Sequence, residues 1–99
     1  MPGVVRVGDS LTTGHACTPT TTLGGAAQST VSANGVLAAV VGAPTVAHPF
    51  PPVPACLPHV ANLNAGSPNV FINGIAVGRI GDSADAGAMI SGSGSVIIN

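Results

Sequence analysis

The 99-residue sequence contains no lysine, glutamate, tryptophan or tyrosine. Its charged side chains are two arginines and three aspartates: Arg6, Arg79, Asp9, Asp82 and Asp85. Non-specific nucleic-acid binding requires several basic side chains on phosphates, and a helix lying on a membrane surface requires a basic polar face. Two arginines supply neither. The composition therefore argues against nucleic acid and against a membrane surface as stable partners.

Aromatic residues are also scarce, because Phe50 and Phe71 are the only two. A chain of this size buries a modest share of its surface, and small domains usually need a disulfide, a metal or a partner as an additional constraint. The low charge points the same way, because a free monomer normally has a more charged surface. We therefore expect another protein to cover part of this surface.

Long hydrophobic segments are absent as well. The longest apolar run, Val36–Val46, is interrupted by Gly42 and Pro44 and is too short to span a bilayer. The N-terminus has no apolar stretch behind a basic start, so we expect synthesis in the cytoplasm without a cleaved signal. In that compartment Cys17 and Cys56 are expected to be reduced, as metal ligands or buried thiols.

The sequence repeats one pattern. Residues 29–43 and 67–82 each contain strand-like segments on both sides of an Asn-Gly pair, which is Asn34-Gly35 in the first and Asn73-Gly74 in the second. In both copies a glycine follows eight residues after the asparagine. Asn-Gly between two strands predicts a β-hairpin with a type I′ turn, since both turn residues favour positive φ.

A third copy is divided between the chain ends. Residues 95–99 match 69–73, and residues 5–10 match 78–83, in register if the two termini are joined. The sequence therefore predicts an all-β fold of three β-hairpin units with pseudo-threefold symmetry. Each hairpin is too small to bury its own face, so the three are expected to share one interior in a small pyramid or cone. The termini should lie side by side.

Three insertions separate the units, at residues 10–25, 43–66 and 83–92. The first two contain every histidine and cysteine, and the second also contains most of the prolines. These loops leave corresponding ends of neighbouring hairpins, so we expect them to converge at a metal-bound tip. The predicted ligands are His15, His48, Cys56 and His59. Three imidazoles and a thiolate suit tetrahedral Zn²⁺, with iron as the alternative metal.

Two other interpretations concern the same residues. In the first, the histidines and cysteines are ordinary loop residues that bind no metal. In the second, Cys17, which lies two residues after His15, takes the place of one of the four predicted ligands. Catalysis is not expected. Asp9 and Asp82 recur at one repeat position, each three residues after an arginine, which indicates ion pairs or turn capping rather than acid–base chemistry.

The sequence resembles the PAAR-repeat family across essentially its whole length. The residues that carry the resemblance are Ser67–Gly74, Arg79–Asp82, Gly8-Asp9, Gly14–Cys17 and the terminal Gly-Ser-x-x-Val-x-x-Asn. The resemblance implies a cone-shaped tip, made in the bacterial cytoplasm, with one structural zinc held by three histidines and a cysteine. On this interpretation residues 1–99 form a single PAAR-like domain with no effector extension.

The resemblance also implies a function and a partner. Such tips sit, one per trimer, on a trimeric β-helical spike of the valine-glycine-repeat or phage tail-spike type. These spikes belong to type VI secretion systems, phage tails and related contractile injection machines. Effector proteins are further possible partners of the tip. The implied role is mechanical: the tip aids puncture of the target envelope and touches the target membrane transiently. A small zinc-binding β adaptor without a spike is the alternative, and a hydrolytic enzyme is a weaker one.

Overall fold

The computed structural model describes residues 2–15, 17–50 and 57–99, without the side chains of residues 49, 50, 57 and 58. Within these ranges the chain is all-β, which confirms the predicted fold class. The strands are β1 (Ser10–Thr12), β2 (Thr20–Thr22), β3 (Ser32–Ala33), β4 (Val36–Leu37), β5 (His48–Phe50), β6 (Leu57–His59), β7 (Phe71–Ile72), β8 (Ile75–Ala76), β9 (Ser83–Ala84) and β10 (Gly87–Ala88). Consecutive strands pair as antiparallel two-stranded sheets.

Both predicted Asn-Gly hairpins form. β3 pairs with β4 around Asn34 and Gly35, whose φ angles are 56° and 78°. β7 pairs with β8 around Asn73 and Gly74, whose φ angles are 53° and 81°. Positive φ at both turn residues is the type I′ geometry, which Asn and Gly adopt with little strain. The prediction of the turn type is confirmed at both sites.

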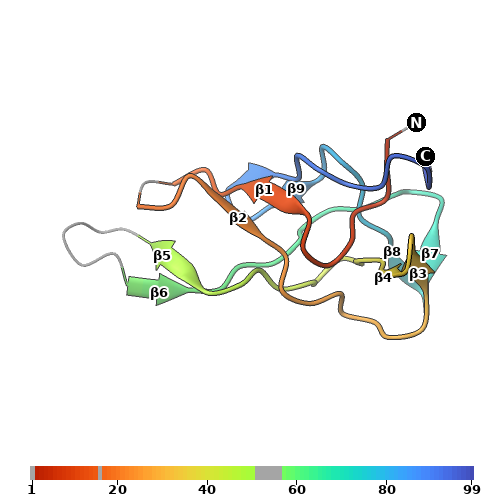
Figure 1. The fold of residues 1–99 in the computed structure, drawn as a ribbon, viewed down its shortest axis with the longest axis horizontal. Helices are drawn as coiled ribbons and strands as arrows, with labels where there is room; N and C mark the ends of the chain where they lie inside the picture. The colour runs from red at the N-terminus through yellow and green to blue at the C-terminus, as the bar shows by residue number, and fades with distance from the viewer. Residues whose placement is uncertain (1, 16, 51–56) are drawn as a thin grey trace.

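The two chain ends lie side by side, as predicted (Figure 1). Gly3 and Ile97 form an antiparallel bridge. The Val4 amide donates to the Val96 carbonyl at 2.9 Å, and the Ile98 amide donates to the Pro2 carbonyl at 3.0 Å. The divided third copy of the repeat is therefore assembled from both termini.

A ring of backbone hydrogen bonds joins the three repeat units. The Val5 amide donates to the Gly78 carbonyl at 3.0 Å, the Gly78 amide to the Ala39 carbonyl at 2.8 Å, and the Ala39 amide to the Val5 carbonyl at 2.9 Å. All three residues are buried, so these peptide groups need protein partners. The ring makes the units mutually dependent at the centre of the molecule. Pseudo-threefold symmetry of the whole chain stays a prediction.

Small and medium apolar side chains fill the interior around this ring. One cluster contains Val5, Leu11, Leu23, Ala39, Ala43, Leu63, Ala84 and Met89. A second contains Val4, Ala33, Ala38, Val40 and Val77. The molecule measures 41 × 23 × 22 Å along its principal axes, so this core is narrow.

The recurring arginine–aspartate pairs are structural, as predicted. Asp9 accepts hydrogen bonds from the Arg6 amide at 2.8 Å and the Arg6 Nε at 3.0 Å. Asp82 accepts the same pair of bonds from Arg79 at 2.7 and 3.0 Å. Burial acts to raise the pKa of Asp9, but the bonds from Arg6 and Ser91 outweigh it and hold that pKa below its ordinary value. Each carboxylate thus caps its own turn.

The long axis separates two different ends (Figure 1). The hairpin end comprises β3, β4, β7, β8 and the two termini. The loop end comprises β5, β6, the segment that joins β1 to β2, and the turn between β9 and β10, whose Asp85 contacts the histidines of that end. The described part of the chain has no helix with the length and apolar character needed to cross a bilayer.

Candidate metal centre

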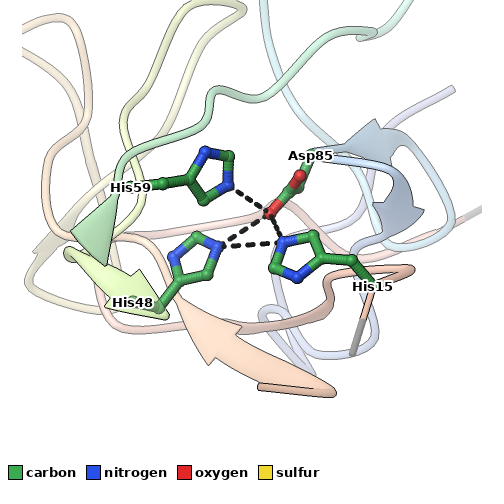
Figure 2. Close-up of side chains that lie close together, drawn as sticks. All are labelled: His15, His48, His59 and Asp85. Carbon is green, nitrogen blue, oxygen red and sulfur yellow. Dashed lines mark hydrogen bonds and ion pairs between the residues drawn. The ribbon is translucent and has the colours of Figure 1, made fainter. Parts of the chain in front are cut away.

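Four side chains at the loop end point toward one another: His15, His48, His59 and Asp85 (Figure 2). Their potential ligand atoms all lie within 4.8 Å of one another. Asp85 Oδ2 lies 2.9 Å from His15 Nε2, 2.8 Å from His48 Nε2 and 3.3 Å from His59 Nε2. The His15 and His48 Nε2 atoms are 3.3 Å apart. Three imidazoles therefore converge on one carboxylate oxygen.

The β5–β6 pair places two of the histidines. His48 begins β5 and His59 ends β6, and the two residues are directly opposite in the antiparallel register. Side chains of directly opposed residues project from the same face of a two-stranded sheet. The proximity of these two histidines across the proline-rich insertion therefore has a simple cause, which is strand register.

The β1–β2 connection supplies His15. This connection is closed by Thr13, whose side chain is buried and whose hydroxyl donates to the Thr18 carbonyl. The Thr13 amide donates to the Pro19 carbonyl at 2.9 Å. These bonds fix the start of the loop two residues before His15.

Asp85 comes from the tight turn between β9 and β10, where its φ is 54°. Its amide donates to the Asn62 carbonyl at 3.1 Å, and the next amide, of Ala86, donates to the Thr13 carbonyl at 3.0 Å. The Asn64 side chain also donates to the Asp85 carbonyl at 2.9 Å. The turn is therefore attached to the first insertion through Thr13 and to the second through Asn62 and Asn64.

Most of this cluster is shielded from water. The side chains of His15, His48 and Asp85 are 7%, 3% and 6% exposed, whereas that of His59 is 26% exposed. Burial acts to raise the pKa of Asp85, but hydrogen bonds from His15, His59 and His48 outweigh it and lower that pKa. The carboxylate is therefore ionised and faces three imidazoles.

The hydrogen bonds of His48 identify the form of its ring. His48 Nδ1 lies 2.9 Å from the Val46 carbonyl oxygen, which can only accept, so Nδ1 carries a proton. Nε2 is then the ring nitrogen that faces the Asp85 carboxylate, 2.8 Å away. An Nδ1–H bonded to a carbonyl is also the usual orienting contact of a metal-bound histidine.

The spacing of the donor atoms fits a small tetrahedral ion. Zinc bonds to nitrogen and oxygen of about 2.0–2.1 Å give tetrahedral edges of about 3.3–3.4 Å. The His15–His48 and His59–Asp85 edges are both 3.3 Å, and the edges from Asp85 to His15 and His48 are 2.9 and 2.8 Å. The two edges from His59 to the other histidines lie within 4.8 Å. The cluster could therefore hold a metal ion after Asp85 moves outward and His59 moves toward the other two histidines.

The outcome for the predicted ligands is mixed. His15, His48 and His59 come together as predicted, whereas Cys56 lies outside the described residues, so its role stays a prediction. Cys17 is disulfide-bonded, which corrects the expectation of a reduced thiol at that position. Asp85 was missed as a candidate ligand. It lies in the third insertion, whereas the ligands predicted from the sequence all lie in the other two.

A protein-family model described as the PAAR motif matches residues 13–92. The chain belongs to the PAAR-motif family. PAAR-motif proteins are structural spike-tip proteins of contractile injection systems rather than enzymes, and the small all-β globule of hairpins is consistent with their cone. A search of curated proteins finds no match.

Proposed function

We propose that this PAAR-motif protein caps a trimeric β-helical spike, with one chain per trimer, and that it aids puncture of the target envelope. In this arrangement the hairpin end faces the spike and the loop end leads. The observation that carries the proposal is the difference between the two ends. The loop end has a polar cluster of potential metal ligands, and the hairpin end has an exposed apolar surface.

The hairpin end has the chemistry of a docking face. It contains an apolar hollow of about 290 Å³, to which all three repeat units contribute. Its lining includes Val4, Ala33, Ala38, Phe71, Ile72 and Ile98. Phe71 is 55% exposed at its rim, although it is one of only two aromatic residues in the chain. Burial of such a surface against apolar side chains of a spike is favourable, at about 25 cal/mol per Å².

The connectivity of the centre supports a threefold partner. In the ring of hydrogen bonds, Val5, Ala39 and Gly78 each donate one backbone bond and accept one from another repeat unit. The hollow is lined by residues of all three units. A single chain built in this way can present three comparable edges to three identical subunits. Continuation of the spike's β-structure by these edges is β-augmentation.

The metal in this proposal is a structural zinc ion, one per chain, with iron as the alternative. The loop end is made of two-stranded pairs, which are marginal by themselves in water. A bound ion would be held by His15, His48 and His59 with a fourth donor, and its binding free energy becomes folding free energy for the loops. A tip stabilised in this way resists fraying when force is applied.

A binding experiment with matched variants tests the proposal. The purified protein is mixed with its cognate trimeric spike and analysed by native mass spectrometry, and one chain per trimer is expected. Phe71→Asp introduces a charge at the hollow and should weaken binding by at least tenfold. Ile90→Asp is the control, because Ile90 is 52% exposed but does not line the hollow. Equal losses in both variants, or three chains per trimer, would contradict the proposal.

A further inference from the structure

We propose that Asp85 Oδ2 is the fourth metal ligand, so that a single ion ties all three insertions together without any thiolate. This inference rests on the metal-stabilised tip proposed above and concerns how that tip is closed. It replaces the sulfur ligand predicted from the sequence with an oxygen.

The position of Oδ2 supports this assignment. In a tetrahedral site each donor atom is at nearly the same distance from the other three. Asp85 Oδ2 has that relation to the histidines, at 2.8 to 3.3 Å from each Nε2 atom. It therefore occupies the fourth vertex of the donor set, and a carboxylate oxygen is an accepted zinc donor.

The turn that carries Asp85 is packed in place against the first insertion. A Cβ atom on Gly14 would lie 2.2 Å from the Ala86 carbonyl oxygen, and one on Gly87 would lie 2.0 Å from the Thr12 carbonyl oxygen. Gly14 also has a φ of 74°, which glycine adopts without strain. Only glycine at these positions permits such close approach. The carboxylate is thus held at the histidines by its backbone as well as by its side-chain contacts.

This ligand set has a topological consequence. His15 belongs to the first insertion, His48 and His59 to the second, and Asp85 to the third. One ion would therefore link all three insertions. With the predicted Cys56 in place of Asp85, the third insertion would have remained outside the metal site.

The absence of sulfur from the set has a chemical consequence. Thiolate ligands lose zinc when peroxide oxidises the sulfur, whereas imidazole and carboxylate donors do not undergo this reaction. Cys17 is disulfide-bonded and so has no thiolate to offer. The tip is therefore expected to retain its metal under oxidising conditions outside the cell that made it.

Cobalt substitution distinguishes oxygen from sulfur ligation without any variant. Co²⁺ bound by a thiolate gives an intense sulfur-to-metal absorption band in the near ultraviolet, and an oxygen ligand does not. We expect the wild-type protein to bind one Co²⁺ with tetrahedral visible bands and no sulfur band, both unchanged in the double variant Cys17→Ser/Cys56→Ser. Asp85→Asn should weaken Co²⁺ binding by at least tenfold, and Asp85→Cys, the positive control, should gain the sulfur band.

The outcomes separate this inference from the proposed function. A wild-type sulfur band that disappears in Cys17→Ser/Cys56→Ser would overturn the assignment of Asp85 but would leave a metal-stabilised tip. Failure of the wild type to bind any metal would contradict the metal part of the proposed function itself. As a second measurement, zinc release in hydrogen peroxide is followed with a colorimetric chelator. The wild type should retain zinc and Asp85→Cys should release it, and release from the wild type would also overturn the inference.

Discussion

The loop end and the hairpin end of this protein are stabilised by different interactions. At the loop end, three histidines and a carboxylate converge in a cluster that could hold a metal ion, and the β5–β6 register places two of the histidines opposite each other. The hairpin end is built from Asn-Gly turns and apolar packing. If the proposed ion is bound, a small chain with few aromatic residues builds a narrow extension beyond its core by replacing hydrophobic burial with metal coordination.

The central ring of hydrogen bonds lies between these ends and joins all three repeat units. Because the ring contains no metal-ligand residue, damage at the loop end should leave it intact. The comparison therefore predicts that the two ends respond separately to perturbation.

Metal removal should have the largest effect. An ion present at about 1,000 times its Kd stabilises a fold by about 4 kcal/mol, which corresponds to a fall in Tm of roughly 15–30 °C when it is removed from a domain of this size. Differential scanning calorimetry with and without a strong chelator measures the fall. Hydrogen exchange should accelerate at residues 13–15 and 83–88 but not at residues 32–37 and 71–76. Uniform acceleration would contradict the separation of the ends.

His48→Ala should reproduce much of this loss, because His48 is the most buried histidine of the cluster and its ring is oriented by the Val46 carbonyl. Metal affinity, measured by competition with a chromophoric chelator, should fall by at least tenfold. Spike binding should persist in the same variant. A variant that keeps its metal affinity would remove His48 from the ligand set.

Gly74→Val should weaken spike binding and leave metal affinity unchanged, the opposite of the effects expected for His48→Ala. The φ of 81° at this position is strained for a β-branched residue, at a cost of about 1–3 kcal/mol, and no neighbouring atom lies within 4 Å of a Cβ there. We expect a lower free energy of unfolding and weaker spike binding, with unchanged metal affinity. Gly94→Ala, at an open position without positive φ, serves as the control. Equal metal loss in Gly74→Val and His48→Ala would mean that the ends are coupled.

The smallest expected effect concerns acid and the Arg6–Asp9 pair between the ends. The folded-state pKa of Asp9 lies below its unfolded value, so the carboxylate stabilises the fold above about pH 4, and this contribution is lost as the pH falls through the lowered pKa. Asp9→Asn should lower Tm slightly at neutral pH and flatten its decline in acid. An unchanged acid profile would show that the pair contributes nothing measurable.

The repeat pattern predicted the hairpins, because Asn34-Gly35 and Asn73-Gly74 specify their turns locally. It also predicted the adjacent termini, since register continues from residue 99 to residue 1. The three histidines could be grouped because they lie in two insertions that leave corresponding ends of neighbouring hairpins and were therefore expected to converge. Asp85 could not be ranked in the same way, because its approach depends on close backbone packing between the β9–β10 turn and Gly14. Such packing has no signature in residue type beyond the glycines themselves.

The central claim is that one ion at the loop end joins the three insertions. Anomalous diffraction at the zinc edge, from crystals of zinc-loaded protein, tests it most directly. The account predicts a single strong peak within bonding distance of the Nε2 atoms of His15, His48 and His59 and of Asp85 Oδ2. A peak elsewhere in the molecule, or these four side chains in direct contact with no metal between them, would contradict it.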